Sequence, residues 1–369
     1  MAKTIIKHKD MVIEYQGIFT HKDIIIKYHK EKISRQYQLS ETELIFHLAE
    51  AFGIYTGASE KADLPIFVNG QTARYQKEIG NFVGAIQLSP VKSRKGKIVT
   101  VIPEGVKVLN LKDSPLLYDS GAFSEVLVGT RTTPEHALKR QLQTLAKFPH
   151  QPKKTYLVSY DLLIDEKHIA GHRIKQRWSL SEGEKAVQET IAAAAYLSSQ
   201  RRYLPSNCRL VLSCQGVNTA QYERCVQEVL SYCESEDTIG LGGWCILGQQ
   251  RRWLPTFWET IERILPIIAS AQIKHIHIFG VSWWRPGRHS PQVHTPLGSL
   301  LWLCDRYGLS LTTDSRSPIA RALRRDKPKA GALHPYWRYN LALERAFLAR
   351  LRQLPPYKPP PPRQLRLFD

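Results

Sequence analysis

The sequence has little of what membrane and secreted proteins carry. Its 369 residues include no run of roughly 18 consecutive apolar residues, the length that a membrane-spanning helix needs. Lysines interrupt the apolar residues near the N-terminus, so no secretory signal is expected. The six cysteines form no Cys-x-x-Cys pair and are too few for a disulfide scaffold. We expect a cytoplasmic protein with reduced, mostly buried thiols, no membrane contact and no structural zinc.

Acidic residues are also scarce. The 52 Lys and Arg residues outnumber the 33 Asp and Glu residues, which gives a formal net charge of +19. Such an excess favours a polyanionic partner, because each neutralised phosphate releases counterions. Nucleic acid is the leading candidate, since no basic amphipathic helix with a continuous apolar face points to a membrane surface.

Three regions differ in pattern. Residues 1–60 predict a small α+β extension, with a hairpin around residues 11–15 and 24–28 and a helix over 44–52. Residues 61–354 alternate short apolar runs with helical patterns, which is typical of βα units and predicts an α/β fold, a TIM (β/α)8 barrel. Residues 355–369 form a proline-rich tail that ends in the peptide QLRLF.

The predicted barrel can be written out element by element. The eight candidate strands are residues 65–68, 106–109, 116–118, 156–160, 209–213, 238–241, 275–279 and 309–313. The candidate helices are residues 134–147, 181–200, 219–234, 255–271 and 295–307, with Ser181 and Glu184 as a capping box. Residues 91–101 predict a basic hairpin inserted early in the barrel.

Polar residues and glycines follow several predicted strands at their carboxyl ends. The strand-end residues are Asp119, Asp161, Gln215, Gly242, Gly243 and Asp314. A single Asp after a strand is commonly a helix N-cap, and a Gly pair is commonly a turn. In a TIM barrel, however, these strand ends meet on one rim, where the chemistry lies. Together they predict an active site.

These segments resemble the tRNA-guanine transglycosylase superfamily over about residues 60–325. DSGAF at residues 119–123 resembles its DSGGF, SCQGV resembles its VQGG, GLGGW resembles its GGL, and TTDS resembles the segment of its late catalytic Asp. DSGAF and the short chain are most similar to the DNA-acting branch, which exchanges guanine in DNA for a 7-deazaguanine such as 7-cyano-7-deazaguanine. The CxCxxC…His zinc motif of the tRNA enzymes has no counterpart after Asp314, which implies no metal or other cofactor.

Base exchange with retained stereochemistry needs a carboxylate nucleophile and a second carboxyl that moves a proton. The resemblance implies that Asp314 is the nucleophile and Asp119 the acid and base. Asp161 would accept hydrogen bonds from the guanine edge, while Gln215 and the backbone N–H groups of Gly242 and Gly243 would donate to its O6. The target base would be flipped out of its stack. Ser120, Phe123, Tyr160 and Trp244 are further candidates for binding it.

Two more groups of residues predict macromolecular contacts. Candidate nucleic-acid contacts are Arg94, Lys95, Trp283, Trp284, Arg285, Arg288, Arg316, Arg324 and Arg325. The C-terminal residues Gln364, Leu365, Leu367 and Phe368 resemble the QLxLF peptide by which bacterial DNA polymerases and repair proteins bind the sliding clamp. The predicted partners are therefore DNA, a 7-deazaguanine base and the clamp.

Two other functions remain open at this point. One is a tRNA-guanine transglycosylase that needs no zinc. The other is a catalytically idle nucleic-acid-binding adaptor, although Asp119 and Asp314 argue for an enzyme. The sequence also leaves open whether an ATPase partner protein is needed.

Overall fold

A computed structural model describes five N-terminal strands and most of residues 83–315. The described residues are 3–8, 11–16, 22–28, 34–39, 66–69, 83–100, 115–148, 150–164, 168–169, 172–173, 178–245, 254–281 and 296–315. Contacts divide the chain into two compact units, residues 1–63 with 318–353 and residues 64–317 with 354–369. We describe each unit by itself.

The first unit contains a four-stranded antiparallel sheet in the order β1 (Lys3–His8), β2 (Met11–Gln16), β3 (Lys22–Tyr28) and β4 (Ser34–Leu39). The predicted hairpin is confirmed as β2 and β3, which pair from Met11↔Tyr28 to Tyr15↔Ile24. Residues 318–353, which the sequence assigned to the barrel domain, lie outside the described residues. The predicted helix at 44–52 and the tail at 355–369 lie outside the described residues.

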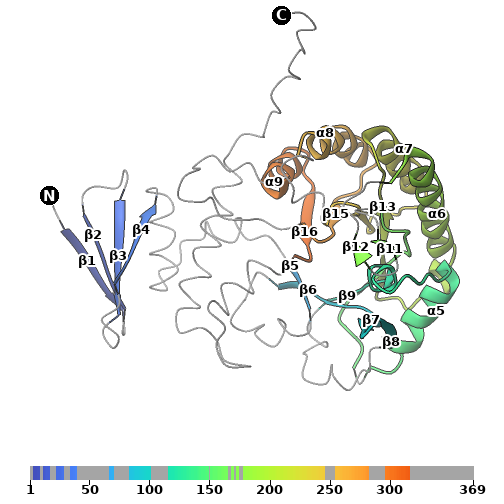
Figure 1. The fold of residues 1–369 in the computed structure, drawn as a ribbon, viewed down its shortest axis with the longest axis horizontal. Coiled ribbons are helices and arrows are strands. Elements are labelled where there is room, and N and C mark those ends of the chain that lie inside the picture. Colours follow the sequence, from blue (N-terminus) through green and yellow to red (C-terminus); the bar gives the residue numbers. More distant parts are fainter. Residues whose placement is uncertain are drawn as a thin grey trace, which may run out of the picture. The chain divides into compact units, whose positions relative to one another are not determined.

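The second unit is a closed barrel of parallel strands, which confirms the predicted TIM fold (Figure 1). Its strands run in the order β5 (Ile66–Asn69), β6 (Val83–Leu88), β9 (Leu116–Tyr118), β10 (Thr155–Val158), β13 (Cys208–Cys214), β14 (Thr238–Leu241), β15 (His275–Ile278) and β16 (Ser310–Thr313). Strand β16 pairs with β5 through Thr313↔Ile66 and so closes the ring.

Seven of these strands lie where the sequence predicted them, and one prediction is wrong. The second barrel strand is β6, not residues 106–109, which lie outside the described residues. The β6 sequence, VGAIQL, has a glycine and a glutamine within a short apolar run. Both residue types weaken the pattern of a buried strand.

The predicted helices are confirmed as α5 (Pro134–Leu145), α6 (Leu180–Ser199), α7 (Thr219–Leu230), α8 (Leu254–Ser270) and α9 (Pro296–Arg306). Shorter elements are α4 (Ala122–Val126), η3 (Arg201–Tyr203) and a small hairpin of β11 (His168–Ile169) and β12 (His172–Arg173). The capping box of α6 uses Ser179 and Glu182, two residues before the predicted pair. None of the described helices combines the length and apolarity that a bilayer crossing requires.

The basic hairpin is also confirmed, as β7 (Val91–Arg94) and β8 (Lys97–Thr100). It begins three residues after β6 ends. Because β6 is a barrel strand, this hairpin stands at the carboxyl end of the barrel, on the side where active sites of TIM barrels lie.

Buried apolar side chains fill the barrel interior. Leu117 from β9, Val158 from β10 and Val211 from β13 form a cluster, against which Tyr156 and Phe279 pack. The ring of His277, on β15, lies 4.7 Å from that of Phe279 in an edge-on arrangement. This packing closes the barrel below the strand ends and leaves polar chemistry to the rim.

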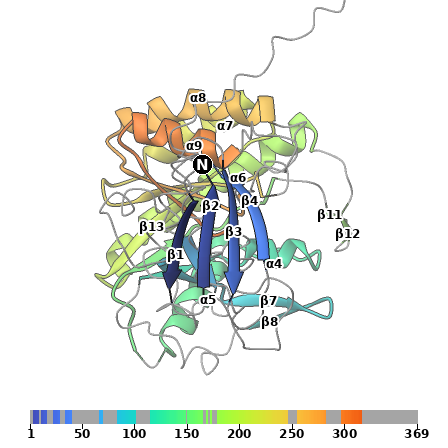
Figure 2. The same cartoon turned by 90° about the vertical axis from the view of Figure 1, so that its left-hand side faces the viewer.

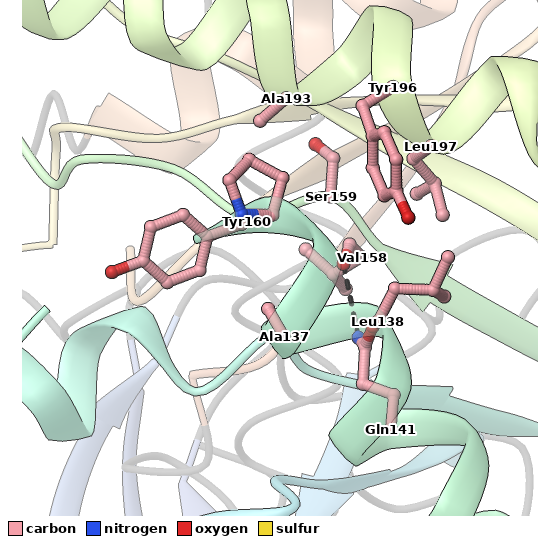
Figure 3. Close-up of a pocket in the computed structure, with 10 residues that line it drawn as sticks. Ala137, Leu138, Gln141, Val158, Ser159, Tyr160, Ala193, Tyr196 and Leu197 are labelled. Atoms are coloured by element: carbon pink, nitrogen blue, oxygen red, sulfur yellow. Dashed lines mark hydrogen bonds between the residues drawn. The ribbon is translucent and has the colours of Figure 1, made fainter. Parts of the chain in front are cut away.

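One buried glutamine holds the carboxyl ends of two adjacent strands. Gln141 on α5 is 1% exposed, and its Nε2 donates to the carbonyl oxygens of Tyr118 at 3.0 Å, Asp119 at 3.1 Å and Val158 at 3.1 Å. Figure 3 shows the bond to Val158. These carbonyls lie where β9 and β10 end, so Gln141 fixes the points from which Asp119 and Asp161 extend.

Replacing Gln141 is therefore expected to destabilise the fold. Gln141→Leu keeps the volume but leaves buried carbonyl groups without their donor, which costs about 2 kcal/mol. The free energy of unfolding is measured by urea denaturation. The matched control is Gln143→Leu, because Gln143 lies exposed on the same helix. Equal stability of the two variants would contradict the role of Gln141.

Candidate active site

Three carboxyl groups meet at the carboxyl end of the barrel. Asp119 follows β9, Asp161 follows β10 and Asp314 follows β16, and each is partly buried. The charge of Asp119 acts on Asp161, and the charge of Asp314 acts on Asp119. The backbone N–H of Asp119 also donates to Leu88 O at 2.8 Å, which ties it to the end of β6. The structure thus brings together the three carboxyl groups that the sequence singled out.

Asp314 accepts a hydrogen bond at each carboxylate oxygen. The backbone N–H of Gly280 donates to Oδ1 at 2.5 Å, and Gln87 Nε2 donates to Oδ2 at 2.8 Å. Donors to both oxygens fix the orientation of the carboxylate. Sequence reasoning missed Gln87 because it missed β6; a polar residue next to the end of an apolar run was the available signal.

The strand that carries Asp314 is held by its neighbour β15. Thr313 Oγ1 donates to Val281 O at 2.8 Å, and the side chains of Thr312 and His277 are hydrogen-bonded at 2.8 Å. Burial lowers the pKa of His277 to about 4, although the charge of Asp314 acts in the opposite direction. His277 is therefore neutral at physiological pH, and it packs in the interior.

The environment of Asp119 favours a protonated carboxyl. Burial, and then the charge of Asp314, raise its pKa to about 6, while the backbone N–H groups of Ser120 and Gly121 and the Arg140 cation act in the opposite direction. A carboxyl with a pKa near 6 can hold a proton and release it close to neutral pH. Asp119 and Asp314 thus lie in environments of opposite character.

The loop that follows Asp119, residues 119–122, is held by a buried polar network. Arg140 donates to Ser120 O at 3.0 Å and to Glu125 Oε1 at 2.7 Å. Tyr160 donates to Glu125 Oε2 at 2.9 Å, and Glu125 is only 3% exposed. We call residues 119–122 the acid loop. Its position depends on side chains from α4, α5 and the end of β10.

A glycine allows the acid loop to approach the hairpin. Gly121 has φ +92°, and a Cβ there would lie 2.6 Å from Val91 Cγ2. Ser124 Oγ donates to Val91 O at 3.5 Å, and Val91 is 1% exposed. The base of the β7–β8 hairpin is therefore packed directly on the acid loop.

Asp161 lies beside the glycine pair that follows β14. Burial, and then the charge of Asp119, raise its pKa to about 7, while its own backbone N–H acts in the opposite direction. A Cβ built on Gly242 would lie 3.8 Å from Asp161 Oδ2. Gly243 has φ +77°, and a Cβ there would lie 2.6 Å from Ile164 O. Gly243 thus lets the loop that begins at Asp161 lie against the end of β14.

Gln215 and Gly242 do not have the predicted donor roles in this structure. Gln215 Nε2 donates to Leu162 O at 2.6 Å and Thr190 Oγ1 at 2.8 Å, while its Oε1 accepts from Ile164 N at 2.7 Å. The N–H of Gly242 donates to Cys214 O at 2.9 Å. Both groups are occupied within the protein. Gln215 positions the loop after Asp161, whereas the Gly242 N–H joins the end of β14 to that of β13.

The predicted base-stacking residues differ in their surroundings. Trp244 is 3% exposed, and its ring packs edge-on against Phe257 at 4.9 Å, so it is a core residue and not a stacking surface. Tyr160 belongs to the network under the acid loop, and Ser120 Oγ accepts from Ala122 N at 3.4 Å. Phe123 is 41% exposed on α4. Stacking of a base on Phe123 or Tyr160 stays a prediction.

Among the predicted nucleic-acid contacts, Arg94 and Lys95 are exposed on the β7–β8 hairpin. The others lie outside the described residues, as do the residues of the clamp-like peptide: Trp283, Trp284, Arg285, Arg288, Arg316, Arg324, Arg325, Gln364, Leu365, Leu367 and Phe368. Within the described part of the chain, no group of His, Cys, Asp or Glu side chains has a geometry that could hold a metal ion. Cys208, Cys214, Cys225 and Cys304 are buried, as expected for most of the thiols.

No protein-family model matches the sequence, and no curated protein matches it. Solved structures of similar fold include a GH5-4 broad-specificity endoglucanase from an uncultured bacterium, at 10% identity and a TM-score of 0.41, covering 75% of this chain and 84% of that one. An endo-β-1,4-mannanase from Thermotoga petrophila has 10% identity and a TM-score of 0.41 over 78% and 77% of the two chains. Active domain 2 of a chitinase from Pyrococcus furiosus has 10% identity and a TM-score of 0.40 over 78% and 98%. Similarity at this level carries no argument about what this chain binds or converts.

The raised pKa of Asp119 predicts how stability changes with pH. The folded protein binds the Asp119 proton more tightly than the unfolded chain, whose carboxyl has a pKa near 3.8. The Asp119 carboxyl therefore lowers the free energy of unfolding progressively as pH rises from about 4 to about 6. At pH 8, Asp119→Asn is expected to raise the free energy of unfolding by about 1 to 2 kcal/mol, a range that allows for the partial exposure of this side chain. Urea denaturation of the variant and the wild type at pH 4 and pH 8 measures this difference in stability. An equal difference at the two pH values would contradict the raised pKa of Asp119.

Proposed function

We propose that the protein is a DNA guanine transglycosylase that exchanges guanine for a 7-deazaguanine, such as 7-cyano-7-deazaguanine, through a covalent glycosyl intermediate on Asp314. The observation that carries the proposal is the contrast between two coupled carboxyl groups. Asp314 has a donor on each oxygen, whereas burial and the charge of Asp314 raise the pKa of Asp119 to about 6. Retaining glycosyl transfer needs an ionised nucleophile and a protonated acid.

In the first half of the proposed reaction, a carboxylate oxygen of Asp314 attacks C1′ of the target nucleotide. The C1′–O bond forms as the C1′–N9 bond breaks, and the proton of Asp119 passes to the departing guanine. In the second half, Asp119 removes the N9 proton of the incoming 7-deazaguanine, whose N9 attacks C1′ and releases Asp314. The two carboxyl groups return to their starting states, so the proposed reaction balances without an oxidant or a metal.

Asp161 supports selection of a guanine-like base. Guanine and 7-deazaguanine each present an N1–H and a 2-amino group on one edge, and a carboxylate can accept from both. Asp161 stands beside Gly242, where no side chain intervenes, and its charge is coupled to that of Asp119. The proposed base site therefore lies between Asp161 and the acid loop.

The choice of DNA rests on the resemblance of DSGAF to the DNA-acting branch and on the missing CxCxxC motif. A tRNA substrate is the rival within the same chemistry. An idle nucleic-acid-binding adaptor is less well supported, because such a protein has no need for three mutually repelling carboxyl groups. Exchange assays on both polymers separate these possibilities.

Asp314→Ala is expected to abolish base exchange and the covalent adduct, since the variant lacks the carboxylate that is proposed to attack C1′. The assay follows incorporation of a labelled 7-deazaguanine into guanine-containing DNA and, in parallel, into tRNA, with denaturing gels to detect the protein–nucleic acid adduct. Asp119→Asn should also lose exchange, by about a hundredfold or more, as expected for loss of a general acid. Wild-type adduct levels in Asp314→Ala would overturn the nucleophile assignment, and incorporation into tRNA alone would overturn the choice of DNA.

Binding of the free base should depend on pH through Asp161. The base binds the ionised carboxylate, and the pKa of Asp161 is about 7. Affinity should therefore rise about tenfold per pH unit up to pH 7 and level off above it. Calorimetric titration of 7-deazaguanine between pH 5 and 8 measures this profile. Asp161→Asn should bind weakly with a flat profile, and a flat profile in the wild type would contradict the role of Asp161.

A further inference from the structure

The β7–β8 hairpin carries a concentration of positive charge beside the candidate active site. Lys92, Arg94, Lys95 and Lys97 are all exposed, and residues 91–100 contain no Asp or Glu. Within the described part of the chain, none of the four makes an ion pair with a carboxylate. Their charge is therefore available to an external anion.

The strand register places the charge on one face. Lys92 pairs with Val99, and Arg94 pairs with Lys97. Directly opposite residues project from the same face, and so do residues two apart in a strand. Lys92, Arg94, Lys97 and Val99 therefore share one face. The other face carries Val91, which is buried, Ile98, which is half-buried, and the exposed polar residues Ser93 and Thr100. The hairpin thus has one cationic face and one uncharged face, and Val91 and Ile98 of the uncharged face are covered by the protein.

This arrangement is unfavourable for the hairpin alone. Arg94 and Lys97 are like charges in a directly opposed pair, which is destabilising in an antiparallel ladder. The turn between them places Lys95 at φ +49° and Gly96 at φ +71°, and the first of these positions favours Asn, Asp or Gly. A third cation therefore stands at the turn beside the opposed pair, and a bound anion would relieve the repulsion among them.

The base of the hairpin connects this charge to the chemistry. Val91 packs on Gly121 of the acid loop, and β7 packs against α4. Figure 2 shows the β7–β8 hairpin next to α4. The preceding strand β6 supplies Gln87 to Asp314 and the carbonyl of Leu88 to Asp119. An anion held on the hairpin would thus lie next to the loop that carries the proposed acid.

We infer that the cationic face of the β7–β8 hairpin binds the sugar-phosphate backbone of the DNA strand beside the nucleotide undergoing exchange. The choice of DNA among polyanions rests on the proposed function. Successive phosphates present negative charge at short intervals, which suits three cations in neighbouring positions on one face and a fourth at the turn. Exposed Val99 adds an apolar contact on the same face.

The test neutralises the cationic face in a triple variant, Lys92→Gln, Arg94→Gln and Lys97→Gln. Binding of a fluorescent duplex of about 20 base pairs is measured by anisotropy over a series of NaCl concentrations. Each lost phosphate contact lowers the slope of log K against log salt by about 0.9, so we expect a fall of about 2 to 3 units and affinity weakened at least about tenfold near 0.1 M salt.

The matched control removes the same charge at the opposite end of the barrel. Lys147, Lys153 and Lys274 are exposed. Lys274 directly precedes β15, Lys153 lies two residues before β10, and Lys147 follows the end of α5. Their triple replacement by Gln should leave the salt slope within about one unit of wild type, since a distant charge makes no phosphate contact. Equal losses in the two triple variants would overturn the inference, because net charge alone would then explain the binding.

A charge-preserving variant, Lys92→Arg with Lys97→Arg, should retain wild-type affinity. The neutralised hairpin variant should melt at the same temperature as wild type or higher, because the opposed cations are gone. Unchanged DNA binding together with lost binding to phosphatidylserine vesicles would overturn the inference in favour of a membrane surface. Base exchange is not needed for this measurement: a wild-type protein that binds DNA through the hairpin but exchanges no base would refute the proposed function alone.

Discussion

Mutual repulsion among three partly buried carboxyl groups is the constraint around which the rim of this barrel is organised. Burial and neighbouring charge raise the pKa of Asp119 and Asp161, while Asp314 receives a donor on each oxygen. Holding such groups close together is unfavourable for folding, so the surrounding structure must fix them. The Arg140 and Glu125 network, the Gln141 bonds and the Gln215 bonds all serve this purpose, because each holds a loop that begins at one of the aspartates.

Much of the fold and the positions of the carboxyl groups could be predicted from the sequence. Strands β9 and β10 are largely apolar runs followed at once by an Asp or by a short polar segment, and β16, SLTT, is a short Thr-rich segment that is followed directly by Asp314. Both patterns depend only on local composition. Strand β6 escaped prediction because Gly84 and Gln87 interrupt its apolar character. The Gln87 side chain donates to Asp314, which lies 227 residues away in the chain. A local sequence pattern cannot predict such a contact.

The roles of Gln215, Gly242 and Trp244 show a different limit. Sequence reasoning placed all three correctly at the rim, but it could not tell which way their polar and aromatic groups face. The Gln215 amide turns toward Leu162, Ile164 and Thr190, and the indole of Trp244 turns into the core against Phe257. Hydrogen bonds within the protein satisfy buried amides, so a buried Gln beside a site more often shapes it than contacts a ligand.

Helix α5 holds the acid loop in place. Its adjacent residues Arg140 and Gln141 hold the successive carbonyls of Ser120 and Asp119, so the helix fixes the acid loop at two consecutive peptide units. The same loop, at Gly121, is packed against Val91 of the hairpin. A closely packed contact transmits displacement because it has no empty space to absorb it. Arg140 and Gln141 therefore hold the acid loop at the point where the hairpin packs on it.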